Sequence, residues 1–161
     1  MEFVELINGF ARELGKNDLE YTGDGICELS VEGLKVSFRE SLDFRTFSLC
    51  GDIGEIPEAS RPELHQILLE ASFLACELDA SYFSLDPESE RVNLNMTRQL
   101  DAFDHKGFYQ LVEDFVNTMS MWRAVISEYK PGDRKRNLER KQDQIQNAGG
   151  VSGPKKPMVR V

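Results

Sequence analysis

The chain has few of the side chains from which catalytic and metal sites are built, with two histidines and three cysteines in 161 residues. Cys27, Cys50 and Cys76 are odd in number and widely spaced, with no Cys-x-x-Cys pair, which argues against a disulfide framework and a zinc site. We expect them to be reduced and mostly buried. His65 and His105 have no ligand or triad partner at suitable spacing, so we expect both at the surface or beside a helix cap.

Two weak signals for a ligand site lie in residues 51–55. Asp52 and Glu55 form a candidate carboxylate pair, but their position at a strand end before Pro57 favours a turn. The sequence Gly-Asp-Ile-Gly at 51–54 is not followed by a helix, as a phosphate-binding loop requires. The sequence therefore predicts a protein that is not an enzyme and holds no metal and no cofactor.

Long apolar runs are also missing, because no stretch approaches the roughly 18 residues that a membrane-spanning helix needs. Glu2 and Glu5 stand where a secretory signal carries lysine or arginine. We therefore expect a cytoplasmic protein without membrane insertion.

Charge is distributed unevenly along the chain. Residues 1–130 hold 11 Lys and Arg against 25 Asp and Glu, a net charge of −14, whereas residues 131–161 hold 8 against 3, a net charge of +5. An acidic body repels phosphate backbones, so no nucleic acid partner is expected for it. Glycines, prolines and a near absence of large apolar residues predict that 131–161 is a flexible basic tail, with 134–146 as its candidate helical part. Either a solvated extension or a contact element fits this pattern.

Hydrophobic periodicity predicts three helices and five strands in residues 1–130. Apolar residues at three- and four-residue spacing indicate a helix over 1–15, and alternation indicates strands over 27–31, 34–38 and 46–53. A capping-box pattern at 60–63 begins a second helix that runs to about residue 79. Strands over 83–85 and 92–96 follow, and Asp104 caps a last helix that ends before Pro131-Gly132. The fold class is therefore α+β, a single domain with an antiparallel five-stranded sheet in the order α-β-β-β-α-β-β-α.

Apolar residues occupy more than one stripe of the second helix, so a subunit contact is expected to cover the excess. We assign one stripe to the core: Leu64, Ile67, Ala71 and Leu74. Positions off that stripe are the predicted interface of a homodimer: Leu68, Ser72, Phe73 and Cys76. In the last helix, Met119, Met121 and Trp122 fit core packing, with adaptable methionine-rich binding as the alternative.

This order of elements, with the acidic body, resembles the class I chaperones of bacterial type III secretion, the family of the Tir chaperone. Four stretches carry the resemblance: FVELINGFARELG at 3–15, GLKVSF at 33–38, LHQILLEASF at 64–73 and the segment 108–122. It covers residues 1–130, and the tail 131–161 departs from the compact family pattern. None of the stretches is a catalytic signature, so the specificity lies in their joint order.

The resemblance implies an ATP-independent cytoplasmic homodimer that keeps the amino-terminal segment of a secreted virulence effector extended for export, with the ATPase of the secretion apparatus as a further candidate partner. Apolar surface on the first helix and the sheet would bind that segment, and the candidates are Phe3, Ile7, Phe38 and Phe47, for which burial in the core is the alternative role. A regulatory protein of the same fold that sequesters a regulator of secretion genes is the rival function. A small enzyme with a cryptic site is a third.

Overall fold

A computed structural model describes residues 2–16, 19, 21, 25–78, 81–133 and 136, without the side chains of residues 43 and 75–78. The chain divides into two compact units, Met1–Tyr129 and Lys130–Val161. The predicted interface side chain of Cys76 and almost all of the predicted tail lie outside the described residues.

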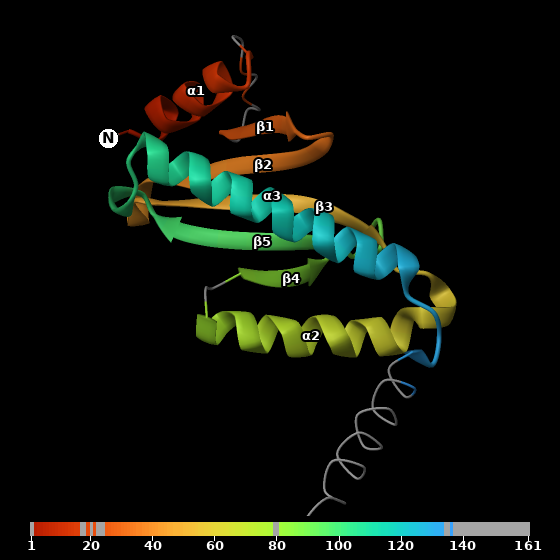
Figure 1. Ribbon diagram of the computed structural model, residues 1–161. Coiled ribbons are helices and arrows are strands. Elements are labelled where there is room, and N and C mark those ends of the chain that lie inside the picture. Colours follow the sequence, from red (N-terminus) through yellow and green to blue (C-terminus); the bar gives the residue numbers. More distant parts are fainter. Residues whose placement is uncertain are drawn as a thin grey trace, which may run out of the picture. The chain divides into compact units, whose positions relative to one another are not determined.

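The first unit contains the predicted three helices and five strands in the predicted order (Figure 1). Their bounds are α1 Phe3–Glu13, β1 Ile26–Val31, β2 Leu34–Ser41, β3 Thr46–Glu55, α2 Arg61–Leu78, β4 Ser81–Leu85, β5 Arg91–Gln99 and α3 His105–Glu128. The α+β prediction is therefore confirmed, and the ends of most elements fall within a few residues of the periodicity-based bounds. Within the described residues, no helix is long and apolar enough to cross a membrane.

The five strands form one antiparallel sheet in the order β1-β2-β3-β5-β4, with β3 at its centre. The pairing of β3 with β5 shifts between Asp52 and Gly54, where the Gly54 amide donates to Asp52 Oδ1 at 2.9 Å. Gly54 has φ +122°, a conformation that side chains disfavour, so this glycine permits the bulge. Asp52 and Glu55 therefore both lie within strand β3, Asp52 at its irregularity, and the predicted turn role is wrong because the strand continues past the bulge to Glu55.

Helices α1 and α3 pack against one face of the sheet, and the core lies between them and the strands (Figure 1). Alternate residues of β1, β2, β3 and β5 point into this layer and are buried, as period-2 patterning requires. Phe47 lies in an aromatic cluster, with ring centroids 5.7 Å from Phe3, 5.6 Å from Phe103 and 5.4 Å from Phe108.

Two glycines allow close helix packing. A Cβ on Gly51 of β3 would lie 2.2 Å from Cε of the buried Met119, so α3 rests on bare backbone there. A Cβ on Gly9 of α1 would lie 2.7 Å from Nδ1 of His105, so the first residue of α3 contacts α1. Asp104 caps α3 as predicted, since its Oδ1 accepts from the Gly107 amide at 2.7 Å.

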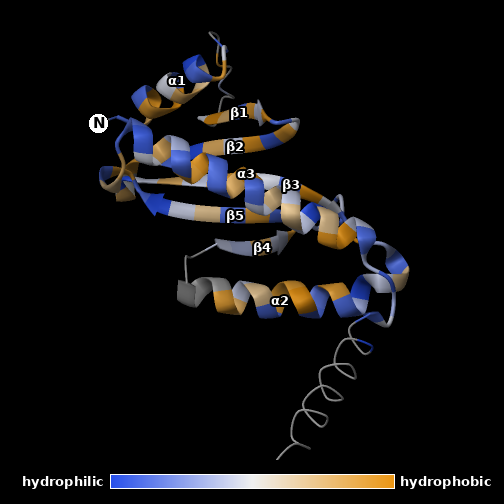
Figure 2. Cartoon of the chain, in the orientation of Figure 1, coloured by the Kyte–Doolittle hydropathy of each residue, from blue (hydrophilic) through white to orange (hydrophobic). Residues whose placement is uncertain are grey.

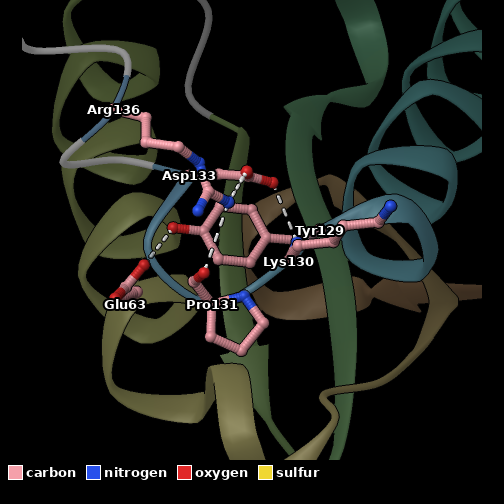
Figure 3. Close-up of polar contacts among 6 residues, drawn as sticks. All are labelled: Glu63, Tyr129, Lys130, Pro131, Asp133 and Arg136. Atoms are coloured by element: carbon pink, nitrogen blue, oxygen red, sulfur yellow. Dashed lines mark hydrogen bonds and ion pairs between the residues drawn. The ribbon is translucent and has the colours of Figure 1, made fainter.

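Tyr129 ends the first unit and binds the start of α2. Its hydroxyl donates to Glu63 Oε2 at 2.5 Å, which joins the carboxyl end of α3 to the first turn of α2 (Figure 3). Within the second unit, Asp133 accepts from the Lys130 amide at 2.9 Å and pairs with Arg136 (Figure 3). The Arg136 hydrogen bond holds the pKa of the Asp133 carboxyl below its ordinary value.

Candidate binding surfaces

The four predicted effector-binding side chains all lie in the core. Phe3 and Ile7 point from α1 toward the sheet, Phe38 and Phe47 point from the sheet toward the helices, and all four are buried. The physical reason is that the apolar stripe of α1 and the apolar face of the sheet cover each other. Contact of these residues with a partner stays a prediction, and their burial weighs against it.

Helix α2 presents its apolar residues differently from the predicted stripes. Leu68, a predicted interface position, is buried beside Leu64, whereas Leu74, a predicted core position, is 56% exposed. The core assignment of Leu74 is therefore wrong, because α2 lies along the edge strand β4 rather than on a sheet face (Figure 1). The interface role of Leu68 stays a prediction, and its burial weighs against it. Among the α2 side chains that the structure describes, Leu64 and Leu68 are the two that are buried in the core.

The exposed apolar residues of α2 form a strip. Leu69 is 70% exposed and Phe73 is 68% exposed, and with Leu74 they make what we call the α2 strip. Figure 2 shows apolar residues recurring along α2. Ser72 is tied to the sheet instead, since its hydroxyl accepts from the Phe83 amide at 3.0 Å. Of the predicted interface positions, Phe73 is therefore a surface residue, Ser72 is half-buried and Leu68 belongs to the core.

An apolar groove of about 200 Å³ runs beside the strip, between α2 and β4. Its lining is His65, Leu68, Leu69, Phe83, Ser84, Leu85 and Val92. Trp122 of α3 packs against Phe83 of the groove lining, with the two ring centroids 4.8 Å apart. Met119 is buried in the core and Trp122 packs against it, which confirms the predicted core role of these two residues. Met121, in contrast, is exposed.

A second exposed apolar feature lies in the connection between β2 and β3, which sequence reasoning missed. Leu42 and Phe44 are 78% and 74% exposed on a short 3-10 turn. Arg45 follows with φ +49° and binds both carboxylate oxygens of Asp101, at 2.6 and 3.0 Å. This hydrogen bonding raises the pKa of Arg45 and lowers the pKa of Asp101. The sequence signal was an interrupted alternation at 42–45, where two large apolar residues stand beside Asp43.

The sheet face opposite α1 and α3, which we call the open face, is polar. Cross-strand pairing aligns Ser37, Cys50, Asn95 and Tyr82 in one row, and Ile26, Arg39, Ser48 and Thr97 in the next. All of these residues except Thr97 line a shallow hollow of about 370 Å³. Burial raises the pKa of the Cys50 thiol, Asp52 raises it further, and Arg39 opposes the shift.

No group of three His, Cys, Asp or Glu side chains in the described residues is placed to hold a metal ion. His105 is exposed beside the cap of α3, as predicted, and His65 lines the apolar groove. Cys27 is buried and Cys50 half-buried, both as free thiols. What the described surfaces offer is area for contact: the α2 strip with its groove, and the open face of the sheet.

Comparison with known proteins was consistent with this architecture. A chain in the structure of the HopA1–SchA chaperone–effector complex superposes with a TM-score of 0.63 at 16% identity, covering 75% of this chain and 92% of that one. The ExsC–ExsE complex gives a TM-score of 0.66 at 15% identity, with 76% and 91% covered. The structure of the Yersinia pestis type III secretion chaperone SycH with a fragment of YscM2 gives a TM-score of 0.58 at 16% identity. This superposition covers 74% of this chain and 98% of that one.

At these identities the structural likeness shows the fold. No curated protein sequence matches the chain. The family model of the Tir chaperone protein (CesT) family, however, matches residues 5–123, nearly three quarters of the sequence, from the first turn of α1 to within α3. The chain therefore belongs to the Tir chaperone protein (CesT) family.

Proposed function

We propose that this protein is a cytoplasmic bacterial chaperone that binds the amino-terminal segment of a type III secreted effector and keeps it extended without ATP. The observation that carries the proposal is the pairing of a chaperone-family fold with contact surface: an exposed apolar strip, an apolar groove and an uncovered sheet face. Ordering an unfolded segment costs about 2–5 kcal/mol, so a large surface is needed to hold one. Binding by contact requires no catalytic or metal group.

The proposal includes a homodimer formed through the α2 strip. Leu69, Phe73 and Leu74 are each more than half exposed, and together they are continuous with the groove beside β4. Contiguous apolar surface of this kind marks interaction sites. A two-fold contact buries the same residues of both copies, so each side chain contributes twice. Leu68 supports the strip from the core, and the predicted roles of Ser72 and Cys76 in the interface stay open to test.

Light scattering tests the dimer directly. At micromolar concentration the mass should be twice the 18.3 kDa of the chain, and a mass of one chain would contradict the proposal. Residues 131–161, the predicted basic tail, are not needed for this contact in our proposal.

Affinity purification from the native host, followed by mass spectrometry, tests the partner. Recovery of secreted proteins, with binding that maps to their amino-terminal segments, is the expected result. Recovery of a regulator of secretion genes in their place would favour the sequestration function. ATP should change neither binding nor release by the isolated protein. The proposed contact with the secretion ATPase predicts that the loaded dimer, more than the empty one, co-purifies with it.

A further inference from the structure

The open face of the sheet is uncovered and hydrogen-bonds mostly within itself. The Ser48 and Thr97 hydroxyls lie 2.9 Å apart, and the Asn95 amide donates to Ser84 at 2.8 Å. At one border of the face, Asp52 pairs with Arg91 at 2.7 Å. Most polar groups there are therefore satisfied before any partner arrives, and contribute little net energy to binding.

Arg39 differs from these neighbours. It lies in β2 on the open face, opposite Ile26 of β1 on one side and Ser48 of β3 on the other. Its side chain is exposed, and it has no hydrogen-bond or ion-pair partner among the described residues. A guanidinium carries five donors in a planar fork that matches a carboxylate. The guanidinium of Arg39 is therefore available to donate hydrogen bonds to an acceptor group on a ligand.

The net charge of the protein and the residues around Arg39 restrict the chemistry of the ligand that can bind there. The first 130 residues carry a net charge of −14, which repels polyanions such as nucleic acids and anionic membranes. A single carboxylate in an otherwise neutral or basic peptide meets no such barrier. Apolar contact is available at both ends of the hollow, from Ile26 and from Tyr82. Tyr82 in β4 lies three strands from Arg39, roughly 14 Å at the usual strand spacing.

We propose that Arg39 is a specificity residue of the open face, which selects a peptide segment with one aspartate or glutamate at Arg39 and an apolar side chain near Tyr82. This inference rests on the proposed function and names the chemistry of the segment that is held. Because the α2 strip lies at the β4 edge, the same chain can present the open face and the strip separately.

The experiment is a selection of displayed random 16-residue peptides on the full chain. The variants are Arg39→Gln and Arg39→Glu, and Lys35→Gln is the matched control, since Lys35 is an exposed cation four residues away on the same strand and face. Circular dichroism checks that each variant is folded, which we expect because both side chains are exposed. Affinities are then measured for selected peptides and for copies in which the acid is replaced by its amide.

On the wild-type chain and on Lys35→Gln, selected peptides should share an acidic residue at a fixed position, and its amide copy should bind about tenfold more weakly. On Arg39→Gln that difference should fall below about twofold, and Arg39→Glu should select lysine or arginine at the same position. Peptides that bind without an acidic position, or whose acid dependence survives in Arg39→Gln, would overturn this inference and leave the proposed function intact. If the wild-type chain enriches no peptide more strongly than an unrelated control protein does, both this inference and the proposed function are contradicted.

Discussion

Replacement of Phe73 by serine should dissociate the proposed dimer while leaving the fold of each subunit intact. Full burial of a phenylalanine side chain stabilises by about 1.5–3 kcal/mol, and 68% of Phe73 is available for burial in the single chain. The loss is then about 1–2 kcal/mol per copy and about 2–4 kcal/mol for a two-fold contact. Each 1.4 kcal/mol is a factor of ten, so the dimer dissociation constant should rise by about 30- to 700-fold.

Sedimentation equilibrium over a concentration series measures that constant, and urea unfolding of the variant under monomeric conditions reports the subunit. Leu69→Ser should act in the same direction, and Leu42→Ser is its matched control, because both leucines are at least 70% exposed but only Leu69 lies on the α2 strip. An unchanged dissociation constant in Phe73→Ser, or an equal effect of Leu42→Ser, would refute the assignment of the interface to this strip.

Four further outcomes are expected. Gly51→Ala should destabilise the fold by about 1–3 kcal/mol in urea unfolding, because its Cβ would overlap the buried Met119, and the same change should cost clearly less in a Met119→Ala background. Asp104→Ala should cost about 1 kcal/mol through loss of the α3 cap, whereas Asp114→Ala on the exposed side of α3 should cost less than half of that. Asp101 has a pKa below its ordinary 3.8 in the fold, so its contribution to stability is present above that pH and is lost as the pH falls through the lowered value; carboxyl chemical shifts should show this titration, and Arg45→Gln should return it toward 3.8. Deletion of residues 132–161 should leave the melting temperature unchanged and the chain dimeric, with a mass twice that of the shortened chain, since the apolar periodicity ends at Ile126 and Tyr129; a truncated chain that unfolds or becomes monomeric would place the domain boundary elsewhere.

Element types and order followed from local chemistry. Period-2 alternation gave β1, β2, β3 and β5, because each has one face buried against helices and one face open. Asp104 signalled the start of α3 because an N-cap acts within one turn. The start of α1 was less visible, since its capping box uses Glu2 and Glu5 in place of the common serine or threonine.

Candidate-site residues were harder to predict, because periodicity shows which residues share a face but not whether that face is covered. Phe38 and Phe47 share a face with Leu49, and this face is covered by α1 and α3. In α2 every side carries apolar residues, so the sequence alone does not show which apolar stripe faces the core. The edge position beside β4 then decides that Leu68 is buried and Leu74 exposed. That position is set by contacts distant in sequence.

The α2 strip and the open face differ in the kind of energy that they can provide to a contact. The α2 strip is apolar and gains stability in proportion to the area buried, which favours a permanent contact with a fixed geometry. The open face is polar and largely self-satisfied, so it gains little from area and discriminates through Arg39. A chaperone needs both properties at different places, because a dimer must persist while its cargo is released. Assignment of assembly to α2 and of cargo selection to the sheet is therefore the division that the chemistry of the two surfaces favours.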